Sequence, residues 1–509
     1  MGMGYAFSYH ERTKYSPSTL GQGHSIDWEH PPEQFKEYRG APVFDMRPYL
    51  PTNQPEDYTP ERGLNDTEGP FALPRLSMLL FATNGVTGVA YSGQQQLYFR
   101  AAPSAGALYP TDLYLAVRDH ADMPDGTYYY HVRDHSLVEV YPKGLAPSGE
   151  EIFSRLTEAC FGDAVVAGAK VALIATAVYF RSSWRYGERA YRRCLLDTGH
   201  VLGNLDIVAP KLNLCTTAVG GFMDHEVAEL LAIVPEKEGV LAVFPLREQA
   251  DFPSLAPGPT ARPSDATEPE AGADPIRAIH TAGAIRRGVA AQPPAGESMD
   301  YAVNPKYEFA AGIKLKPTGL DLTDQIEGAI LRRRSTRAFS GEALKLGELA
   351  DLLAFAYRPD LMLGADALPR LMAPSLLETF VVVNKLEGVP PGVYYFAPGF
   401  MEMLSVKQAE VRREIFHLCL GQELARDASV VVIHTSDLEI ATARFGSRAY
   451  RYLHLDAGHI GERMNVAAMR LGVGASGIGG FFDDEVNELL GIPSKELCVY
   501  ITCLGRPAG

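Results

Sequence analysis

Hydrophobic positions along this chain form two kinds of pattern, short continuous runs and longer stretches with helical spacing. The longest continuous runs, such as 171-VALIATAVYF-180, have the length of a buried strand and are far too short to span a membrane. Other stretches, among them 464-MNVAAMRL-471, place apolar residues on one face of a helix. In each half, the order predicts a helix, a strand, a hairpin, a helix, a strand, a long helix, a glycine turn and a short helix.

The pattern occurs twice along the chain. The segment from Arg185 to Ile233 aligns without a gap with the segment from Arg444 to Ile492, an offset of 259 residues, and 22 of the 49 aligned positions are identical. A unit this long that is repeated only once predicts a fused dimer rather than a solenoid. We therefore expect two tandem copies of one domain that pack against each other as an intramolecular pseudo-dimer.

The composition changes abruptly between the two copies. Residues 251–275 (DFPSLAPGPTARPSDATEPEAGADP) are rich in Pro, Ala, Gly and Glu and cannot supply a core, which is typical of a linker. The predicted organisation is an N-terminal arm at 1–69, a first domain at 70–250, a Pro/Ala-rich linker at 251–319 and a second domain at 320–509.

The net charge and the cysteines indicate which kinds of partner and which cell compartment to expect. The formal net charge of −15 disfavours nucleic acid and anionic membranes as partners, since both attract a basic surface. The six cysteines form no C-x-x-C pair and have no metal-ligand spacing, which predicts free thiols and no metal site. The N-terminus lacks the apolar core of a signal peptide. Together these features predict a cytoplasmic protein that does not enter the membrane.

Four segments together resemble the nitroreductase superfamily: RRRSTRAFSG at 332–341, RAAPSAGALYP at 100–110, LDAGHIG at 455–461 and GIGGFFDDEVNELLGI at 477–492. Within that superfamily, PSAGALYP and the opening YHERTKYS at 9–16 are similar to SagB-type dehydrogenases, which include azoline oxidases of peptide natural-product pathways. The resemblance covers nearly the whole chain apart from the linker. It implies a nitroreductase-like α+β fold in which FMN lies at the dimer interface and is held by both subunits.

The resemblance also implies which residues hold the cofactor. Guanidinium and hydroxyl groups are the donors that a phosphate needs, and a flavin ring needs close backbone approach and amide hydrogen bonds. The implied phosphate ligands are Arg333, Ser335, Arg337 and Arg506. The implied contacts to the ring are Gly479, Gly480, Gln422 and the loop Pro103, Ser104, Ala105 and Gly106.

The two copies do not share these elements equally. The RRSTR cluster precedes only the second copy, and PSAGALYP occurs only in the first, where the second copy has the shortened 373-APSLLETF-380. Gln422 corresponds to Asp163 in the first copy. In nitroreductase dimers the phosphate cluster and the glycine turn come from one subunit and the Pro-Ser loop from the other. We therefore expect one composite site that binds one FMN per chain and a second, pseudo-symmetric site that has lost the cofactor.

Arg185 and Tyr186 are the candidates for catalysis. A phenol beside the flavin can give or take a proton if a neighbouring cation lowers its pKa. Azoline-oxidising relatives carry a Lys-Tyr pair in this region, and the replacement of Lys by a permanently charged Arg speaks against azoline oxidation here. The second copy has Arg444 and Phe445 at these positions, so an aromatic packing role for Tyr186 stays open.

Three further patterns favour structural roles. Glycines 472, 474 and 477 match a dinucleotide-binding motif but follow an amphipathic helix instead of a strand, so no Rossmann site is expected. Two histidines recur at predicted helix starts and are expected to pack or to bond there. Carboxylates after each GGF turn are expected to cap the short helix that follows. These histidines and carboxylates are His200, His459, Asp224, Glu226, Asp483 and Glu485.

The sequence thus predicts an FMN-dependent oxidoreductase that transfers a hydride between flavin and a small-molecule or peptide-borne substrate. Oxidation of a peptide heterocycle by oxygen and reduction of a small aromatic compound with NAD(P)H as donor are both open. A non-catalytic scaffold or peptide-binding subunit of a modifying complex, and a protein that carries or consumes FMN, are the alternatives. Association into further homo-oligomers is also left open.

Overall fold

The computed structural model describes residues 4–20, 24–50, 69, 71–92, 95–142, 144–248, 272–289, 306–363 and 369–508. Most of the Pro-rich stretch between the copies, 249–271, lies outside the described residues, as does the segment 51–68 of the N-terminal arm.

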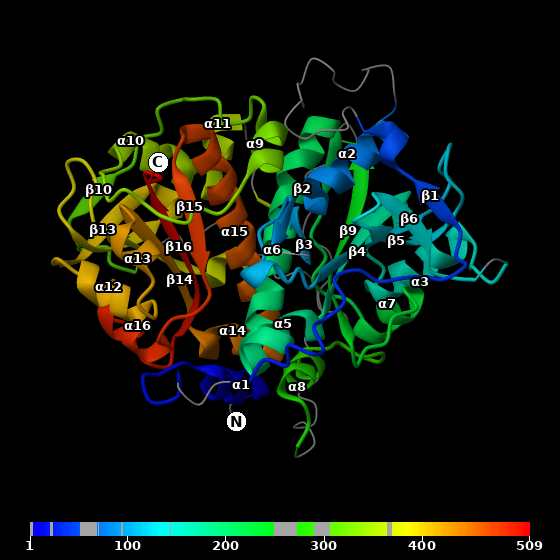
Figure 1. The fold of residues 1–509 in the computed structure, drawn as a ribbon, viewed down its shortest axis with the longest axis horizontal. Coiled ribbons are helices and arrows are strands. Elements are labelled where there is room, and N and C mark those ends of the chain that lie inside the picture. The colour runs from blue at the N-terminus through cyan, green and yellow to red at the C-terminus, as the bar shows by residue number, and fades with distance from the viewer. Residues whose placement is uncertain are drawn as a thin grey trace.

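Each half is built on a seven-stranded antiparallel sheet, and the two sheets have equivalent strand orders (Figure 1). The first has the order β1-β6-β5-β4-β7-β9-β8 and the second β10-β13-β12-β11-β14-β16-β15. The strands of the first sheet are β1 (Val43–Asp45), β4 (Thr111–Val117), β5 (Gly126–His131), β6 (Ser136–Glu139), β7 (Val171–Val178), β8 (Leu214–Thr216) and β9 (Glu238–Glu248). Those of the second are β10 (Gly312–Lys314), β11 (Glu378–Val383), β12 (Gly392–Ala397), β13 (Glu402–Gln408), β14 (Val430–Ser436), β15 (Gly474–Ile478) and β16 (Leu497–Gly505). The α+β class and the two tandem copies predicted from the sequence are confirmed.

Helices cover both faces of each sheet, which explains the continuous apolar runs. On β7, Leu173 and Ala175 belong to the large core that the two halves share, whereas Ala172 and Ile174 belong to a separate core on the outer face. Successive side chains of a strand point to opposite faces, so a strand buried on both sides needs apolar residues at every position.

The helices follow the same duplicated order. In the first half they are α1 (Tyr5–Thr13), α2 (Leu73–Asn84), α3 (Gly149–Ala159), α4 (Ala164–Gly168), α5 (Tyr179–Tyr186), α6 (Ala190–Val208) and α7 (Asp224–Leu230). In the second half they are α8 (Pro275–Ala282), α9 (Ile326–Arg332), α10 (Leu346–Tyr357), α11 (Asp360–Leu363), α12 (Arg412–Leu418), α13 (Glu423–Asp427), α14 (Leu438–Phe445), α15 (Ala449–Leu471) and α16 (Asp483–Leu490).

The two long helices, α6 and α15, cross at the centre of the molecule, where the halves meet (Figure 1). A β-carbon added to Gly199 would lie 2.2 Å from the carbonyl oxygen of Leu455, and one added to Gly458 would lie 2.2 Å from that of Leu196. Glycine is therefore required at both positions for the backbones to approach so closely. His200 and His459 lie inside these helices, so the expectation that they stand at helix starts was wrong. His200 bonds the Leu196 carbonyl and His459 bonds Asp206 of the other half.

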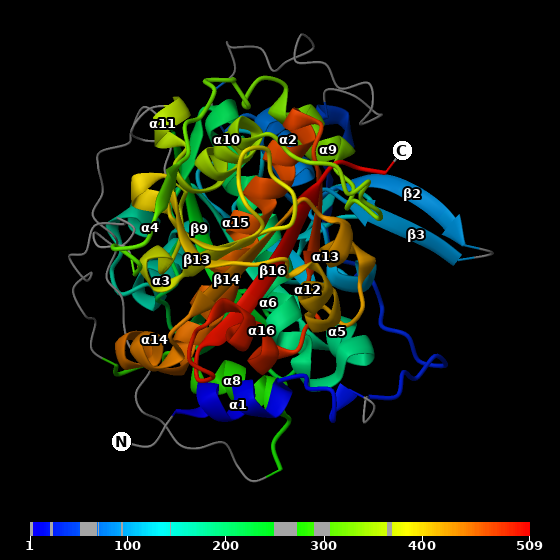
Figure 2. The ribbon, with the colours of Figure 1, turned by 90° about the vertical axis from the view of Figure 1, so that its left-hand side faces the viewer.

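Short helical arms precede both halves and lie side by side (Figures 1 and 2). The arm of the first half, α1, is followed by a parallel bridge between Tyr15 and Phe482 of the second half. The equivalent arm of the second half, α8, is followed by a bridge between Ile285 and Met223 of the first half. Each arm thus reaches across to the other half. Helix α8 and strand β10 fall inside the stretch interpreted from composition as a linker.

A hairpin of β2 (Val86–Ser92) and β3 (Gln95–Arg100) forms a separate two-stranded sheet that projects from the body (Figure 2). The described residues of the second half contain no equivalent hairpin. Strand β3 leads directly into the Pro-Ser loop at 103–106. None of the helices in the described ranges is both long and apolar enough to cross a membrane. Among the same residues, no His, Cys, Asp and Glu side chains gather into a group that could hold a metal ion.

Candidate functional site at the junction of the halves

The Pro-Ser loop is held in place by a buried carboxylate of α6. Ser104 Oγ donates a hydrogen bond of 2.5 Å to Asp197, and the Ala105 amide lies 3.2 Å from the same carboxylate. Burial raises the pKa of Asp197 to about 7, and the hydrogen bonds from Ser104 and Ala105 only partly oppose it. Gly106 follows with a φ of 65°, a left-handed conformation that favours glycine. Asp197 was not singled out from the sequence, although its repeat partner Asp456 holds the shortened loop of the second half in the same way.

The predicted catalytic pair lies against this loop. A β-carbon on Gly106 would lie 2.7 Å from Tyr186 Oη and 3.4 Å from Arg185 Cδ. Tyr186 is half-buried at the end of α5, whereas Arg185 is exposed. Burial raises the pKa of Tyr186 above its ordinary value, and the charges of Arg193 and Arg185 offset only part of that rise. The phenol therefore stays protonated near neutral pH, so it can donate a proton but is a poor base.

The glycine turn of the second half faces these residues from across the junction. Gly479 and Gly480 follow β15 directly, and Gln422 donates hydrogen bonds to the carbonyls of Cys419 (2.9 Å) and Gly480 (3.3 Å). In this geometry the Gln422 side chain binds the backbone of the glycine turn. Its counterpart Asp163 instead caps α4 by accepting from the amides of Val165 and Val166.

The predicted phosphate segment runs from the end of α9 to the Pro-Ser loop of the other half. Arg333 is buried and donates a 3.0 Å hydrogen bond to the Ala101 carbonyl, two residues before Pro103. The Thr336 amide bonds the Ala475 carbonyl at the start of β15. Four strand residues, roughly 13 Å, therefore separate this segment from the glycine turn.

The four expected phosphate ligands differ in their present contacts. Arg337 is exposed and Ser335 half-buried, and neither has a side-chain hydrogen bond or ion pair with the described residues. Arg506 is bound to Glu348 by two hydrogen bonds of 2.6 Å. Ser335 and Arg337 are thus available to a ligand, whereas Arg333 and Arg506 also stabilise the surrounding structure.

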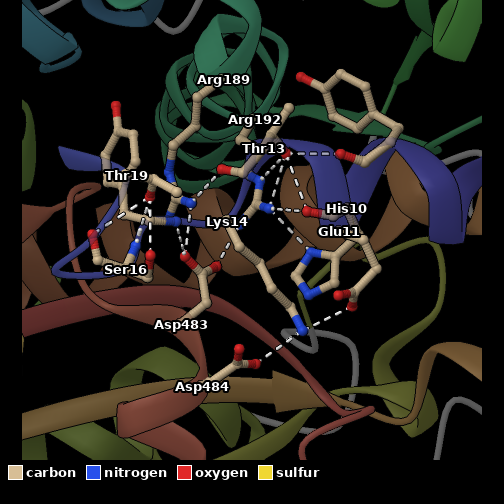
Figure 3. Close-up of polar contacts among 12 residues, drawn as sticks. His10, Glu11, Thr13, Lys14, Ser16, Thr19, Arg189, Arg192, Asp483 and Asp484 are labelled. Carbon is tan, nitrogen blue, oxygen red and sulfur yellow. Dashed lines mark hydrogen bonds and ion pairs between the residues drawn. The ribbon is translucent and has the colours of Figure 1, made fainter. Parts of the chain in front are cut away.

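The carboxylates after the GGF turns lie in the first turn of their helices, as expected for pairing with the helix dipole, but they do not cap them, so the capping expectation was wrong. The N-cap positions are Met223 and Phe482, without a side-chain hydrogen bond. Asp483 instead binds Arg189 and Arg192 of the first half at 2.7 and 2.6 Å, and it accepts a hydrogen bond from the Tyr15 amide (Figure 3).

The same arrangement recurs on the opposite side of the molecule. Asp224 binds Arg448 and Arg451 of the second half, both at 2.7 Å, and accepts from the Ile285 amide. Burial acts to raise the pKa values of Asp224 and Asp483, but the arginines hold both below the ordinary range. These buried charges, paired across the junction, fasten the halves and the arms together.

One residue of the site was missed by reasoning from the sequence. Arg193 of α6 is buried and lies with its guanidinium carbon 4.0 Å from the centre of the Tyr186 ring. β-carbons on Gly479 and Gly480 would lie 3.8 and 3.7 Å from Arg193 atoms. The repeat held a signal for it, because the equivalent position in the second copy is the uncharged Tyr452.

The pseudo-symmetric site is more closely filled. A β-carbon on Gly220 would lie 2.7 Å from the Tyr452 ring and 3.0 Å from the Met372 sulfur. Arg448 donates to the Gly220 carbonyl from both Nε and Nη2, at 2.9 and 2.7 Å. The corresponding Nε and Nη2 atoms of Arg189 are buried and have no hydrogen-bond partner among the described residues. At this pair of equivalent arginines, the unsatisfied donors thus lie on the side that carries the expected cofactor residues.

The residues of this first site fit a flavin mononucleotide. Ser335 and Arg337 provide phosphate donors, and the glycine turn leaves room for a ring, since a β-carbon on Gly479 would meet no atom closer than 3.8 Å. The structure brings together the Pro-Ser loop, Tyr186, the glycine turn, Gln422 and the phosphate segment, which belong to both halves.

Known proteins show the same duplication and the same domain. A family model described as Nitroreductase family matches residues 75–246 and again 330–506. A crystal structure of a nitroreductase-family protein from Anabaena variabilis ATCC 29413 is 40% identical, with a TM-score of 0.87 over 100% of both chains. The nitroreductase-family protein MJ1384 of Methanocaldococcus jannaschii is 36% identical over 177 residues, which are 35% of this chain and 81% of that protein.

A further relative is the trifolitoxin-processing protein TfxB of Rhizobium leguminosarum bv. trifolii. It is 30% identical over 151 residues, 28% of this chain and 38% of TfxB. Because the family model matches more than half of the chain, once in each copy, the chain belongs to the nitroreductase family and carries two of its domains in tandem.

Proposed function

We propose that this protein is an FMN-dependent oxidoreductase that binds one FMN per chain between its two halves. Membership of the nitroreductase family supports a flavin-dependent oxidoreductase in general. The observation that carries the specific proposal is the contact between Arg333 of the second half and Ala101 of the first. It joins the phosphate segment to the segment that leads into the Pro-Ser loop, which supports a site on this side of the junction that is built from both halves.

In this proposal the second half holds the phosphate and the first half covers the ring. Ser335 and Arg337 bind the phosphate, with Arg333 and Arg506 adding positive charge. The backbone of Gly479 and Gly480 approaches the ring, and Pro103, Ser104, Ala105 and Gly106 close it from the other half. When bound, FMN supplies the hydride chemistry, with N5 as the reacting atom.

Tyr186 and Arg185 then lie on the substrate side. The protonated phenol of Tyr186 can donate a proton or a hydrogen bond to a substrate held over the ring. Arg185 is exposed and permanently charged, so it can orient an anionic or polar group but cannot exchange a proton.

The substrate class is supported by resemblance alone. The similarity to SagB-type dehydrogenases and the name of the trifolitoxin-processing relative favour a peptide-borne substrate, with a small molecule as the other candidate. NAD(P)H is a candidate electron donor that would dock on the flavin directly. The acidic net charge of −15 fits neither a nucleic-acid partner nor an anionic membrane. We also propose that the protein acts in the cytoplasm.

The direct test is the amount of flavin per chain. The purified protein is incubated with FMN and desalted, and the flavin released by heat is quantified. About one FMN per chain is expected. Two per chain would contradict the loss of the second site, and none would favour the non-catalytic scaffold.

A double substitution tests the position of the phosphate. Arg333→Ala with Arg337→Ala is expected to abolish FMN retention, since it removes two charged donors. Arg332→Ala is the matched control, because Arg332 is an exposed arginine of the same segment. Full retention of FMN by the double variant would contradict this phosphate site.

A further inference from the structure

Arg193 lies at the proposed site and makes no ion pair with the described residues, although its charge acts on the buried Asp197 of the same helix. It projects from α6 of the first half, with its guanidinium over the Tyr186 ring and beside the glycine turn of the second half. Its side chain is buried, with a relative exposure of 7%, and none of the ion pairs among the described residues includes it. Nη1 has no hydrogen-bond partner within the described ranges.

The neighbouring buried arginine shows what a structural role looks like here. Arg192 bonds Asp483, His10 and Thr13 and is fully engaged (Figure 3). Arg193 is one residue away on the same helix and has none of these partners. A buried guanidinium is costly unless its donors are satisfied, so the unpartnered Nη1 atom of Arg193 indicates a ligand that accepts a hydrogen bond there.

The second half provides an internal comparison. The position of Arg193 is taken there by Tyr452, whose hydroxyl accepts a hydrogen bond from Arg448 and whose ring packs against Gly220. Of the two equivalent positions, the buried guanidinium is therefore present at the one beside the Pro-Ser loop and Tyr186. We therefore infer that the Arg193 side chain binds a ligand of that site.

We propose that Arg193 binds a carboxylate of the substrate, so that the site selects small molecules or peptide termini that carry a negative charge. The inference rests on the proposed function and names the substrate class of the same site. A guanidinium can grip a carboxylate through two parallel hydrogen bonds, and a low-polarity environment strengthens that contact. The contact with Arg193 would place the substrate next to the Tyr186 phenol, which is the predicted proton donor.

Binding of a charged probe and its neutral analogue tests the proposal. Benzoate and benzamide are titrated into the protein by isothermal calorimetry, with FMN bound and without it. Benzoate is expected to bind at least about tenfold more tightly than benzamide, which is the effect of even one of the two charge-assisted hydrogen bonds. Arg193→Gln should remove this preference and Arg193→Lys should retain part of it. Arg444→Gln, at the equivalent of Arg185 in the other half, should leave it unchanged.

Two other outcomes would overturn the proposal. Equal binding of benzoate and benzamide by the unsubstituted protein would show that no carboxylate subsite exists. If Arg193→Gln kept the benzoate preference but lowered FMN retention or shifted the reduction potential of the bound flavin, the guanidinium would serve the cofactor instead. If the protein bound no FMN, the proposed function would be contradicted. The titrations of benzoate and benzamide into the FMN-free protein would still test whether Arg193 binds a carboxylate.

Discussion

At the scale of single residues, the Tyr186 phenol is confined between Gly106, Arg185 and Arg193. The sequence suggested that a neighbouring cation would lower its pKa and allow it to act as a base. The structure adds burial, which raises the pKa and outweighs both arginines. The phenol is therefore suited to donation of a proton, and removal of its hydroxyl should affect chemistry more than folding.

Tyr186→Phe is expected to retain FMN and stability but to lower the rate of substrate turnover by about 100-fold, the usual contribution of a positioned proton donor. Stopped-flow measurement of flavin reduction and reoxidation would give the rate. Phe445→Tyr, the reciprocal change at the other site, is the control and should have no effect. An unchanged rate in Tyr186→Phe would assign Tyr186 to aromatic packing.

Asp456 gives a pH-dependent prediction that does not involve the proposed site. Burial raises its pKa to about 7 in the folded protein, although amides of Met372 and Ala373 bond the carboxylate. Because the folded state holds this proton more tightly than the unfolded chain, its stabilising effect is complete below about pH 4. The effect is lost as the pH rises through about 7.

Asp456→Asn should therefore gain stability relative to the unsubstituted protein between pH 5 and pH 8, on the order of 1–3 kcal/mol. Urea unfolding at both pH values measures the difference. Asp484→Asn, at an exposed carboxylate, should show no such change. A difference that is the same at both pH values would mean that Asp456 titrates normally in the folded protein.

At the scale of elements, the crossing of α6 and α15 depends on two glycines. Each faces a backbone carbonyl of the opposite helix, so any side chain would force the helices apart. Gly458→Ala is expected to lower the free energy of unfolding by about 1–3 kcal/mol, the usual effect of overpacking, even though alanine favours a helix. Thermal unfolding followed by circular dichroism would measure it.

Gly168→Ala in α4 is the matched helical control, since no described atom lies within 4 Å of its added β-carbon. It should be neutral or slightly stabilising. Equal stability of the Gly458 and Gly168 variants would show that the crossing can relax without loss.

At the scale of the whole molecule, two equivalent sets of buried ion pairs fasten the halves. Asp483→Asn leaves Arg189 and Arg192 without a counter-charge and should lower the free energy of unfolding by about 3 kcal/mol, as removal of one partner of a buried pair usually does. Asp224→Asn should have a similar effect through Arg448 and Arg451. Denaturant unfolding would measure both.

The adjacent Asp484→Asn is the control for these substitutions. Its bond to Lys14 is solvent-exposed on the Asp484 side, so a loss below about 1 kcal/mol is expected. If Asp483→Asn were as mild as Asp484→Asn, the buried pairs would not be what fastens the halves.

The fusion of two domains would allow one site to be lost without harm to the other, as the proposed single FMN site requires. Each site combines the Pro-Ser loop region of one half with the glycine turn of the other. The two sites therefore depend on different elements of the same chain, so substitutions such as Tyr452 and Asp163 affect only one of them. In a homodimer, the same substitutions would alter both sites at once.

The sequence by itself determined the duplication, the α+β class and the content of the central strands. These follow from local patterns, because an apolar run or a repeated motif specifies its element regardless of distant residues. The unequal distribution of RRSTR and PSAGALYP also predicted that the two segments meet, and Arg333 does contact the first half at Ala101.

Only the tertiary structure decided which buried charged side chains pair with a distant side chain of opposite charge. Asp483 lies nearly three hundred positions from Arg189 and Arg192, so its local sequence resembled a helix cap while its partners stood in the other half. Arg193 and Arg192 are adjacent and alike in sequence, yet Arg192 is bound to Asp483 whereas Nη1 of Arg193 is buried with no partner among the described residues. The charge of a buried side chain is balanced by whatever the fold brings within hydrogen-bond distance, and that proximity is a property of packing rather than of sequence order.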